Sequence, residues 1–333
     1  MSLDLPLIWA GLIGFSIIAY VVLDGFDLGI GILFPAIRKD KDRDTIVNSV
    51  APVWDGNETW LVLGGGGLLA AFPLAYAVVL PALYAPLIAM LLGLIFRGVA
   101  FEFRFKAGRT KYLWDIAFFG GSVLATFTQG VVLGAFVQGI EMKGRAYAGG
   151  WWDWLTPFSL FTGLALVVGY AVLGVGWLIM KTTGDLQDSL YRLARPLGLA
   201  LLACVGIVSL WTPLLDETIA SRWFSWPNIL YLSPVPVLVV LAAWMYDFGL
   251  RQRREALPFL SALAVFLLSF AGLGISLYPH IIPPAVTIWD AAAPEESLWF
   301  LLIGAVILLP LVLAYTAHAY WVFRGKVDAT GYH

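Results

Sequence analysis

The sequence predicts an all-α integral membrane protein with nine transmembrane helices. Of its 333 residues, 60% are hydrophobic and only 13% are charged, a balance typical of membrane proteins. A helix needs roughly 20 apolar residues to cross the hydrocarbon core, because it rises about 1.5 Å per residue. Runs free of Asp, Glu, Lys and Arg cover residues 5–23, 59–96, 116–140, 154–180, 197–215, 223–246, 256–289 and 297–323.

Each run accounts for at least one helix. The run 5–23 lacks the basic start and the small-residue cleavage pattern of a signal peptide, so we expect it to remain as a helix. The run 59–96 is too long for one span, and we expect it to hold one helix and most of a second, with a turn near residues 72–81. The other runs supply one helix each. Since the loops between them are short, residues 1–333 should form a single membrane domain.

The distribution of basic residues predicts the orientation. When nine spans are threaded, 16 Lys and Arg residues fall in one set of loops and 3 in the opposite set. Loops rich in Lys and Arg stay in the cytoplasm. We therefore expect the N-terminus outside and the C-terminus, from Arg324 onward, in the cytoplasm.

Cysteine and histidine usage argues against a metal or haem site in this chain. The single Cys204 provides neither a disulfide framework nor a cysteine metal site. The histidines are His280, His318 and His333, few for a protein that supplies several axial haem ligands. The net charge of −2 gives no reason to expect a nucleic-acid partner.

Charged residues inside the apolar helices are the best candidates for function, because an ionised group at membrane depth is costly and usually marks an ion or proton path. Asp24 and Asp27 are three residues apart and share one helical face. At low dielectric they should not both be ionised without a cation. They are either a protonatable relay or a structural pair neutralised by Arg97, and these two roles are compatible.

Two further charged residues lie in the third predicted helix. Arg97 is at a depth similar to that of Asp27, so we expect it to pair with a carboxylate of the first helix. Glu102 is nearer the cytoplasmic surface, where it could form a buried ion pair or take up protons. The alternative for both side chains is that they reach the interface and stay hydrated there.

Other polar and small residues have structural interpretations. Asp55 and Glu58 have the spacing of a capping box, with Asp55 as the N-cap of the second helix. The glycine run 64–67 predicts close helix packing or the approach of lipid or quinone. Gln129 and Gln138 are expected to form interhelical hydrogen bonds.

Taken together, six segments resemble subunit II of the cytochrome bd-type quinol oxidases. In chain order they are DGFDLGIG from Asp24, NSVAPVWDGNETW from Asn48, FRGVAFEF from Phe96, YP at Tyr278, IWDA from Ile288 and YTAHAYW from Tyr315. The resemblance implies two four-helix bundles plus one peripheral helix. On this chain it divides the residues into 1–145, 150–280 and a ninth helix with a cytoplasmic tail, 294–333.

The resemblance also implies a function. Subunit II would be the haem-free partner of a haem-bearing subunit I, with small single-helix subunits, lipid and quinone as further partners. The complex would sit in the bacterial inner membrane, oxidise quinol and reduce dioxygen to water with cytoplasmic protons, building a proton-motive force without pumping. Its haems, b-type and in some forms d-type, would all be in subunit I.

The matching motifs assign the expected site residues to positions in this sequence. The resemblance implies no catalytic, cofactor-binding or metal-binding residue in this chain, and a proton path at the interface with subunit I. The path residues are Asp24, Asp27, Asp55 and Glu102. Arg97 would be their electrostatic partner and Trp54 a neighbouring support. Many relatives have Asp in place of Glu102, so the acidic role is kept with a longer side chain.

Two other functions fit the same residues. Intramembrane Asp and Arg with glycine-rich helices also suit an autonomous ion-coupled secondary transporter or channel. A scaffold whose acids are merely paired is the third hypothesis. A haem-bearing partner would separate the oxidase from the transporter, and neutralising the acids would separate a proton path from a scaffold.

Overall fold

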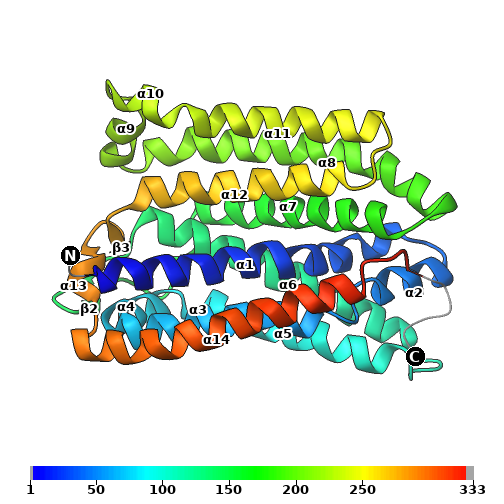
Figure 1. Cartoon of the computed structure of the whole chain (residues 1–333), viewed down its shortest axis with the longest axis horizontal. Coiled ribbons are helices and arrows are strands. Elements are labelled where there is room, and N and C mark those ends of the chain that lie inside the picture. Colours follow the sequence, from blue (N-terminus) through cyan, green and yellow to red (C-terminus); the bar gives the residue numbers. More distant parts are fainter. Residues whose placement is uncertain (1–2, 328–333) are drawn as a thin grey trace.

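The computed structural model describes residues 3–327, and these are almost entirely helical (Figure 1). The α-helices are α1 Leu5–Leu33, α2 Asp40–Asn48, α3 Trp54–Ala71, α4 Pro73–Ala82, α5 Tyr84–Arg104, α6 Lys111–Gln138, α7 Pro157–Lys181, α8 Gly184–Trp211, α9 Glu217–Phe224, α10 Asn228–Leu232, α11 Pro234–Arg251, α12 Leu257–Leu277, α13 Ile288–Ala291 and α14 Glu295–Val322. The short elements are the 3-10 helices η1 Phe34–Ala36 and η2 Thr212–Leu214 and the strands β1 Met142–Lys143, β2 Ala146–Tyr147, β3 His280–Ile282 and β4 Val286–Thr287. The strands form two antiparallel hairpins, β1–β2 and β3–β4.

Eight helices within residues 3–327 are long and apolar enough to cross a membrane, counting short continuations with the helix that they extend. They are α1, α5, α6, α7, α8, α11, α12 and α14. The ninth span expected at the start of run 59–96 is not among them, because that stretch is divided into α3 and the 10-residue α4. Pro73 causes the break, since proline pushes the residue before it out of the helical region, and Phe72 has φ −134° and ψ 64°.

The predicted capping box at Asp55 is wrong. α3 begins at Trp54, its N-cap is Val53, and no side chain caps it. Glu58 therefore does not reach back to the start of α3, and its carboxylate is free to contact another helix.

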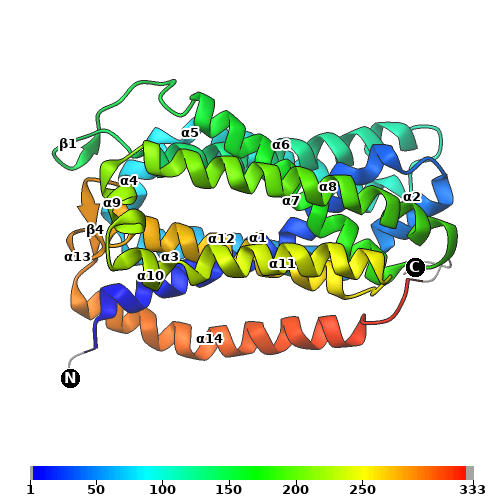
Figure 2. The same cartoon turned by 90° about the horizontal axis from the view of Figure 1, so that it is seen from above.

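α1 is the central helix, and it packs against α3, α6 and α7. Figures 1 and 2 show the long helices running side by side along the molecule. Glycine allows the closest approach: a Cβ at Gly29 of α1 would lie 1.9 Å from the Tyr170 carbonyl oxygen of α7. The glycine run of α3 is only partly packed, because Gly64 and Gly67 face α1 while Gly65 and Gly66 have no neighbour within 4 Å.

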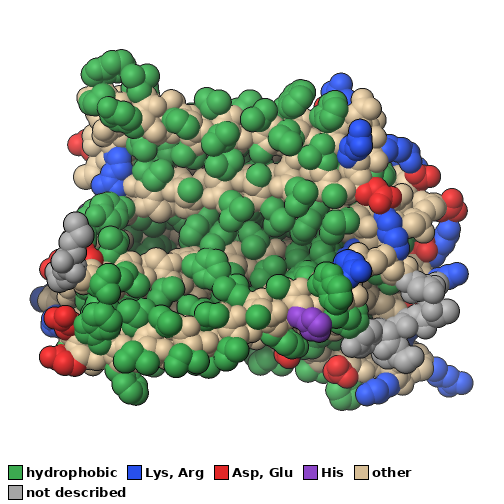
Figure 3. All heavy atoms as spheres, viewed as in Figure 1, with side chains coloured by type: hydrophobic (Ala, Val, Ile, Leu, Met, Phe, Trp, Pro, Cys, Tyr) green, Lys and Arg blue, Asp and Glu red, His purple; other side chains and the backbone are tan. Residues whose placement is uncertain are grey.

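The second half of the chain adds α8, α11 and α12 around α7. α14 then returns to the first half, where it contacts α1 and α3. Figure 2 shows it along one edge of the molecule. In Figure 3 the Lys and Arg side chains gather at one end, where α2 lies, beyond a largely hydrophobic surface.

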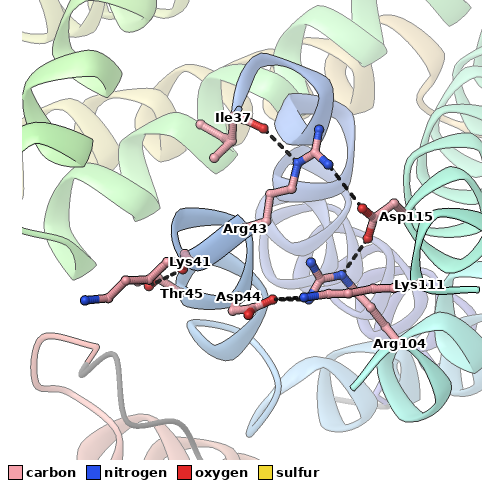
Figure 4. A network of polar contacts seen from close by, with 8 residues as sticks. All are labelled: Ile37, Lys41, Arg43, Asp44, Thr45, Arg104, Lys111 and Asp115. Atoms are coloured by element: carbon pink, nitrogen blue, oxygen red, sulfur yellow. Dashed lines mark hydrogen bonds and ion pairs between the residues drawn. The ribbon is translucent and has the colours of Figure 1, made fainter. Parts of the chain in front are cut away.

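An ion cluster joins three helices at this end, and we call it the terminal ion cluster (Figure 4). It consists of Arg43, Asp44, Arg104, Lys111 and Asp115. Arg104 is its centre: the guanidinium binds Asp115 at 2.7 Å and Asp44 at 2.5 Å, and the side chain is 1% exposed. The cluster ties the ends of α2, α5 and α6 together.

Lowering the pH should weaken this cluster through Asp44. Burial by itself would raise the pKa of Asp44, but hydrogen bonds from Arg104 and Lys111 outweigh it and lower that pKa below the ordinary 3.8. The ionised Asp44 therefore contributes its full stabilisation above the pKa that it has in the unfolded chain. This stabilisation is lost as the pH falls through the lowered pKa of the folded protein. In detergent, we expect the loss of thermal stability below about pH 4 to be smaller in Asp44→Asn than in the wild type. Asp40→Asn, at the exposed start of α2, is the control, and equal losses in all three proteins would contradict this account.

Candidate functional site

The candidate site is built around Arg97, whose side chain is fully buried. Arg97 lies on α5 with its side chain 0% exposed. Nη1 donates to Asp24 Oδ1 of α1 at 2.7 Å, and Nη2 donates to Glu58 Oε1 of α3 at 2.8 Å. The ion pair expected between Arg97 and a carboxylate of the first helix is confirmed, and that carboxylate is Asp24. We call Asp24, Asp27, Glu58 and Arg97 the Arg97 cluster.

Asp27 belongs to the cluster but makes no ion pair with any residue that the structure describes. Its Oδ2 accepts a hydrogen bond from the Asn57 amide nitrogen at 2.7 Å, and its Oδ1 is buried without a hydrogen-bond partner in the described part of the chain. Asn57 also donates to the Leu23 carbonyl oxygen at 3.3 Å and accepts from the Tyr320 hydroxyl at 3.0 Å. Asp27 is thus held by a neutral group, whereas Asp24 is held by a charge.

The charges of the Arg97 cluster do not balance if every group is ionised. Three carboxylates would then face one guanidinium in a setting of low dielectric, where each uncompensated charge is expensive. Asp24 and Glu58 each have a short contact with Arg97. Within residues 3–327 the partners of Asp27 are uncharged. Protonating Asp27 therefore balances the charge of the cluster without breaking an ion pair.

Aromatic rings cover one side of the arginine. The Trp54 ring stacks on Phe101 with 4.9 Å between centroids. The Arg97 guanidinium carbon lies 5.7 Å from the Trp54 centroid and 5.8 Å from that of Phe101, within cation–π range. Trp54 is therefore a neighbour of Arg97, as the motif comparison predicts.

Asp55 and Glu102 lie outside this buried cluster. Both are exposed, and within residues 3–327 neither carboxylate makes an ion pair or a hydrogen bond. The structure thus brings Asp24, Asp27, Arg97 and Trp54 together and leaves these two predicted path residues at the surface.

The family-model comparison identifies the chain. The model of cytochrome bd terminal oxidase subunit II matches residues 5–323. The chain belongs to this family. Subunit 2 of the cytochrome bd-I ubiquinol oxidase of Escherichia coli strain K12 is 30% identical over 360 residues, covering 97% of this chain and 95% of that protein. Subunit 2 of the cytochrome bd ubiquinol oxidase of Bacillus subtilis is 28% identical over 335 residues, with 96% of each chain covered.

A solved structure agrees with the fold. The bd oxidase from Geobacillus thermodenitrificans superposes with a TM-score of 0.80 at 18% identity, covering 96% of this chain and 99% of the other. This bd-type subunit II is therefore a multi-pass membrane protein of a quinol:oxygen oxidoreductase complex. Membership implies a subunit I partner, and haems and quinol in the complex.

Two residues of the site were missed by sequence reasoning. Glu58 received a capping role, because it lies in the polar start of α3, close to Asp55. Nothing in the sequence indicated a role for Asn57, because its partner Tyr320 is 263 residues away along the chain. Gln129 behaves as predicted, since its side chain links the hydroxyl groups of Tyr20 and Tyr170 across three helices.

A resident metal site is not evident in the part of subunit II that the structure describes. Within residues 3–327, no group of three or more His, Cys, Asp or Glu side chains is arranged to hold a metal ion. His280 lies in β3 and His318 in α14, while His333 is outside the described residues.

Proposed function

We propose that this chain is the haem-free subunit of its oxidase and that the Arg97 cluster delivers cytoplasmic protons to subunit I. There they would be consumed as quinol reduces dioxygen to water, which builds a proton-motive force without pumping. The observation that carries this proposal is the buried Asp27, which lies next to the Asp24–Arg97–Glu58 ion pairs and has no cationic partner within the described residues 3–327. A purely structural ion pair has no need of the third carboxyl group.

Glu58 supplies a step between the surface and the buried acids. Its side chain is 25% exposed, whereas that of Asp24 is 0% exposed. Asp55 is exposed and lies three residues earlier on α3, so the two acids share a helical face. The order Asp55, Glu58, Arg97 with Asp24, then Asp27 leads from water to the interior. Glu102, exposed near the end of α5, is a second proton-uptake group in this proposal.

The arrangement of the helices supports the two-bundle division as a proposal. In this division α1, α3, α5 and α6 are one set, and α7, α8, α11 and α12 are the other. α7 also packs extensively against α1 and α6, so it joins the two sets. With α3 and α4 together as the second span, and α14 as the ninth, these sets correspond to residues 1–145, 150–280 and 294–333. The last of these ranges includes residues 328–333, outside the described part of the chain.

Purification tests the function directly. Purification in mild detergent through a tag on this chain should give a coloured complex, whose absorption spectrum shows a haem-bearing subunit I. Mass spectrometry of the same complex should identify any small single-helix subunits. Bound lipid and quinone can be extracted from the same sample. A colourless protein that purifies alone would instead support the ion-coupled transporter or channel.

Topology is a separate expectation. In the bacterial inner membrane we expect the N-terminus outside and the basic end in the cytoplasm, because basic loops are retained there. Cysteines introduced at Asp42, and at Asp328 outside the described residues, should resist an impermeant thiol reagent applied to intact cells. A cysteine introduced at Glu295, at the start of α14, is the matched position expected to react. Labelling at both Asp42 and Asp328 would overturn this orientation.

A further inference from the structure

Asp27 is connected to α14 by two hydrogen bonds that pass through Asn57. The Asn57 amide nitrogen donates to Asp27, and its amide oxygen accepts from the Tyr320 hydroxyl. Asp27 and Asn57 are 0% and 1% exposed, so the connection begins in the interior. It involves neither Arg97 nor Glu58, and is therefore a branch that meets the Arg97 cluster only at Asp27.

A cavity of about 20 Å³ lies where this branch meets α14. Asn57 and Tyr320 both line it, with Gly56 on the α3 side and Thr316 on the α14 side. One water molecule needs roughly 10–15 Å³ and two to four polar partners. The side chains of Asn57, Thr316 and Tyr320 can supply those partners, so both the volume and the lining fit water.

The cavity is near the basic end of the molecule. Tyr320 is in the last turn of α14, which ends at Val322. Residues 52–57 lead into the first turn of α3. The C-terminal end of α14 points toward the end where the Lys and Arg side chains gather (Figures 1 and 3). Water at this position therefore has a short way to the cytoplasmic surface under the proposed orientation.

We propose that this cavity binds water and forms a second route for protons to Asp27, with Asn57 as its gate. An amide cannot carry a proton at working pH, so the route is closed while Asn57 bonds to Asp27. When the Asn57 side chain rotates away, a hydronium ion in the cavity can transfer its proton to the Asp27 carboxylate. The products are neutral water and a neutral carboxyl group. Tyr320 is a positioning residue, because its hydroxyl group lies at the cavity and orients the water there.

Gly56 offers a way to fill the cavity. A Cβ there would meet only a Tyr315 ring carbon at 3.9 Å, so Gly56→Val can place its methyl groups in the cavity with little strain. Because this inference rests on the proposed proton path, Asp27→Asn is measured in parallel. The matched control is Gly304→Val, since a Cβ at Gly304 of α14 meets nothing within 4 Å.

The experiment is quinol-driven oxygen uptake per haem, measured on the assembled complex across a range of pH. Gly56→Val should lower turnover severalfold and increasingly as the pH rises and protons become scarce, while Gly304→Val follows the wild type. Tyr320→Phe keeps the ring and removes the hydroxyl group, so it should change the pH profile in the same direction. If Gly56→Val does not assemble, Gly56→Ala and Tyr320→Phe decide the question.

The outcomes separate this inference from the proposed function. If Asp27→Asn slows turnover but the Gly56 and Tyr320 variants keep the wild-type pH profile, the cavity is not a proton route and only this inference fails. If Asp27→Asn itself has wild-type turnover per haem, the proton path fails and the cavity route fails with it.

Discussion

Replacing Arg97 with leucine is expected to cost the complex its assembly or its haem. The substitution removes the cation that holds Asp24 at 2.7 Å and Glu58 at 2.8 Å, and leaves these acids without a counter-ion in the interior. Breaking a buried pair in this way destabilises proteins by roughly 3–5 kcal/mol. The measurement is haem content and thermal stability of the tagged complex.

A charge-matched variant tests whether the stranded acids cause the loss. Combining Arg97→Leu with Asp24→Asn and Glu58→Gln removes the charges together, so assembly should recover in part relative to the single variant. Arg195→Leu is the control, because Arg195 lies 3.6 Å from Asp247 with its side chain 61% exposed. Surface pairs contribute little. A fully assembled, active Arg97→Leu complex would mean that the ion pair is dispensable.

The membrane helices were predictable because their signal is local. Apolar runs of sufficient length are typical of membrane spans, and eight of the nine expected spans are found as helices within the described residues. The break between α3 and α4 at Phe72 lies at the start of the turn predicted near residues 72–81, and Pro73 sets its position.

The site was predictable only where depth in the membrane limits the choice of partner. Arg97 was placed at a depth similar to that of Asp27, and a buried cation requires an anion, so a pair with a carboxylate of the first helix followed from the sequence. That the carboxylate is Asp24 did not. Glu58 was missed because an exposed capping role and a buried ion pair use the same carboxylate. The Asn57–Tyr320 contact depends on how α14 returns to α3, which no local pattern encodes.

The burial of Arg104 in the terminal ion cluster could not be predicted from the sequence either. Arg104 was counted only as a basic residue that marks the cytoplasmic side. In the structure its side chain is 1% exposed, and it bridges Asp44 and Asp115. Charge statistics give the side of the membrane on which a residue lies, and tertiary packing decides whether that residue is solvated or buried in an ion pair.

Proton delivery predicts a kinetic defect when Asp27 is replaced with asparagine. The amide keeps the shape of the carboxyl group and can still accept the hydrogen bond from Asn57, but it cannot carry a proton at working pH. Turnover per haem should fall, by roughly 100-fold if Asp27 is essential for proton transfer. Haem spectra and the amount of complex should stay near the wild-type values, since no buried charge loses its partner.

A proton path through Asp27 predicts smaller turnover defects for Glu102→Gln and Asp55→Asn than for Asp27→Asn. Both acids are exposed, so each can be replaced as an uptake group by water or by its neighbour, and their defects should be smaller than that of Asp27→Asn. The test is quinol-driven oxygen uptake normalised to haem for each variant. A structural acid behaves differently: its amide is silent, or lowers the amount of complex while activity per haem is unchanged. Wild-type turnover per haem in Asp27→Asn and Glu102→Gln would remove both residues from the path and leave the scaffold hypothesis standing.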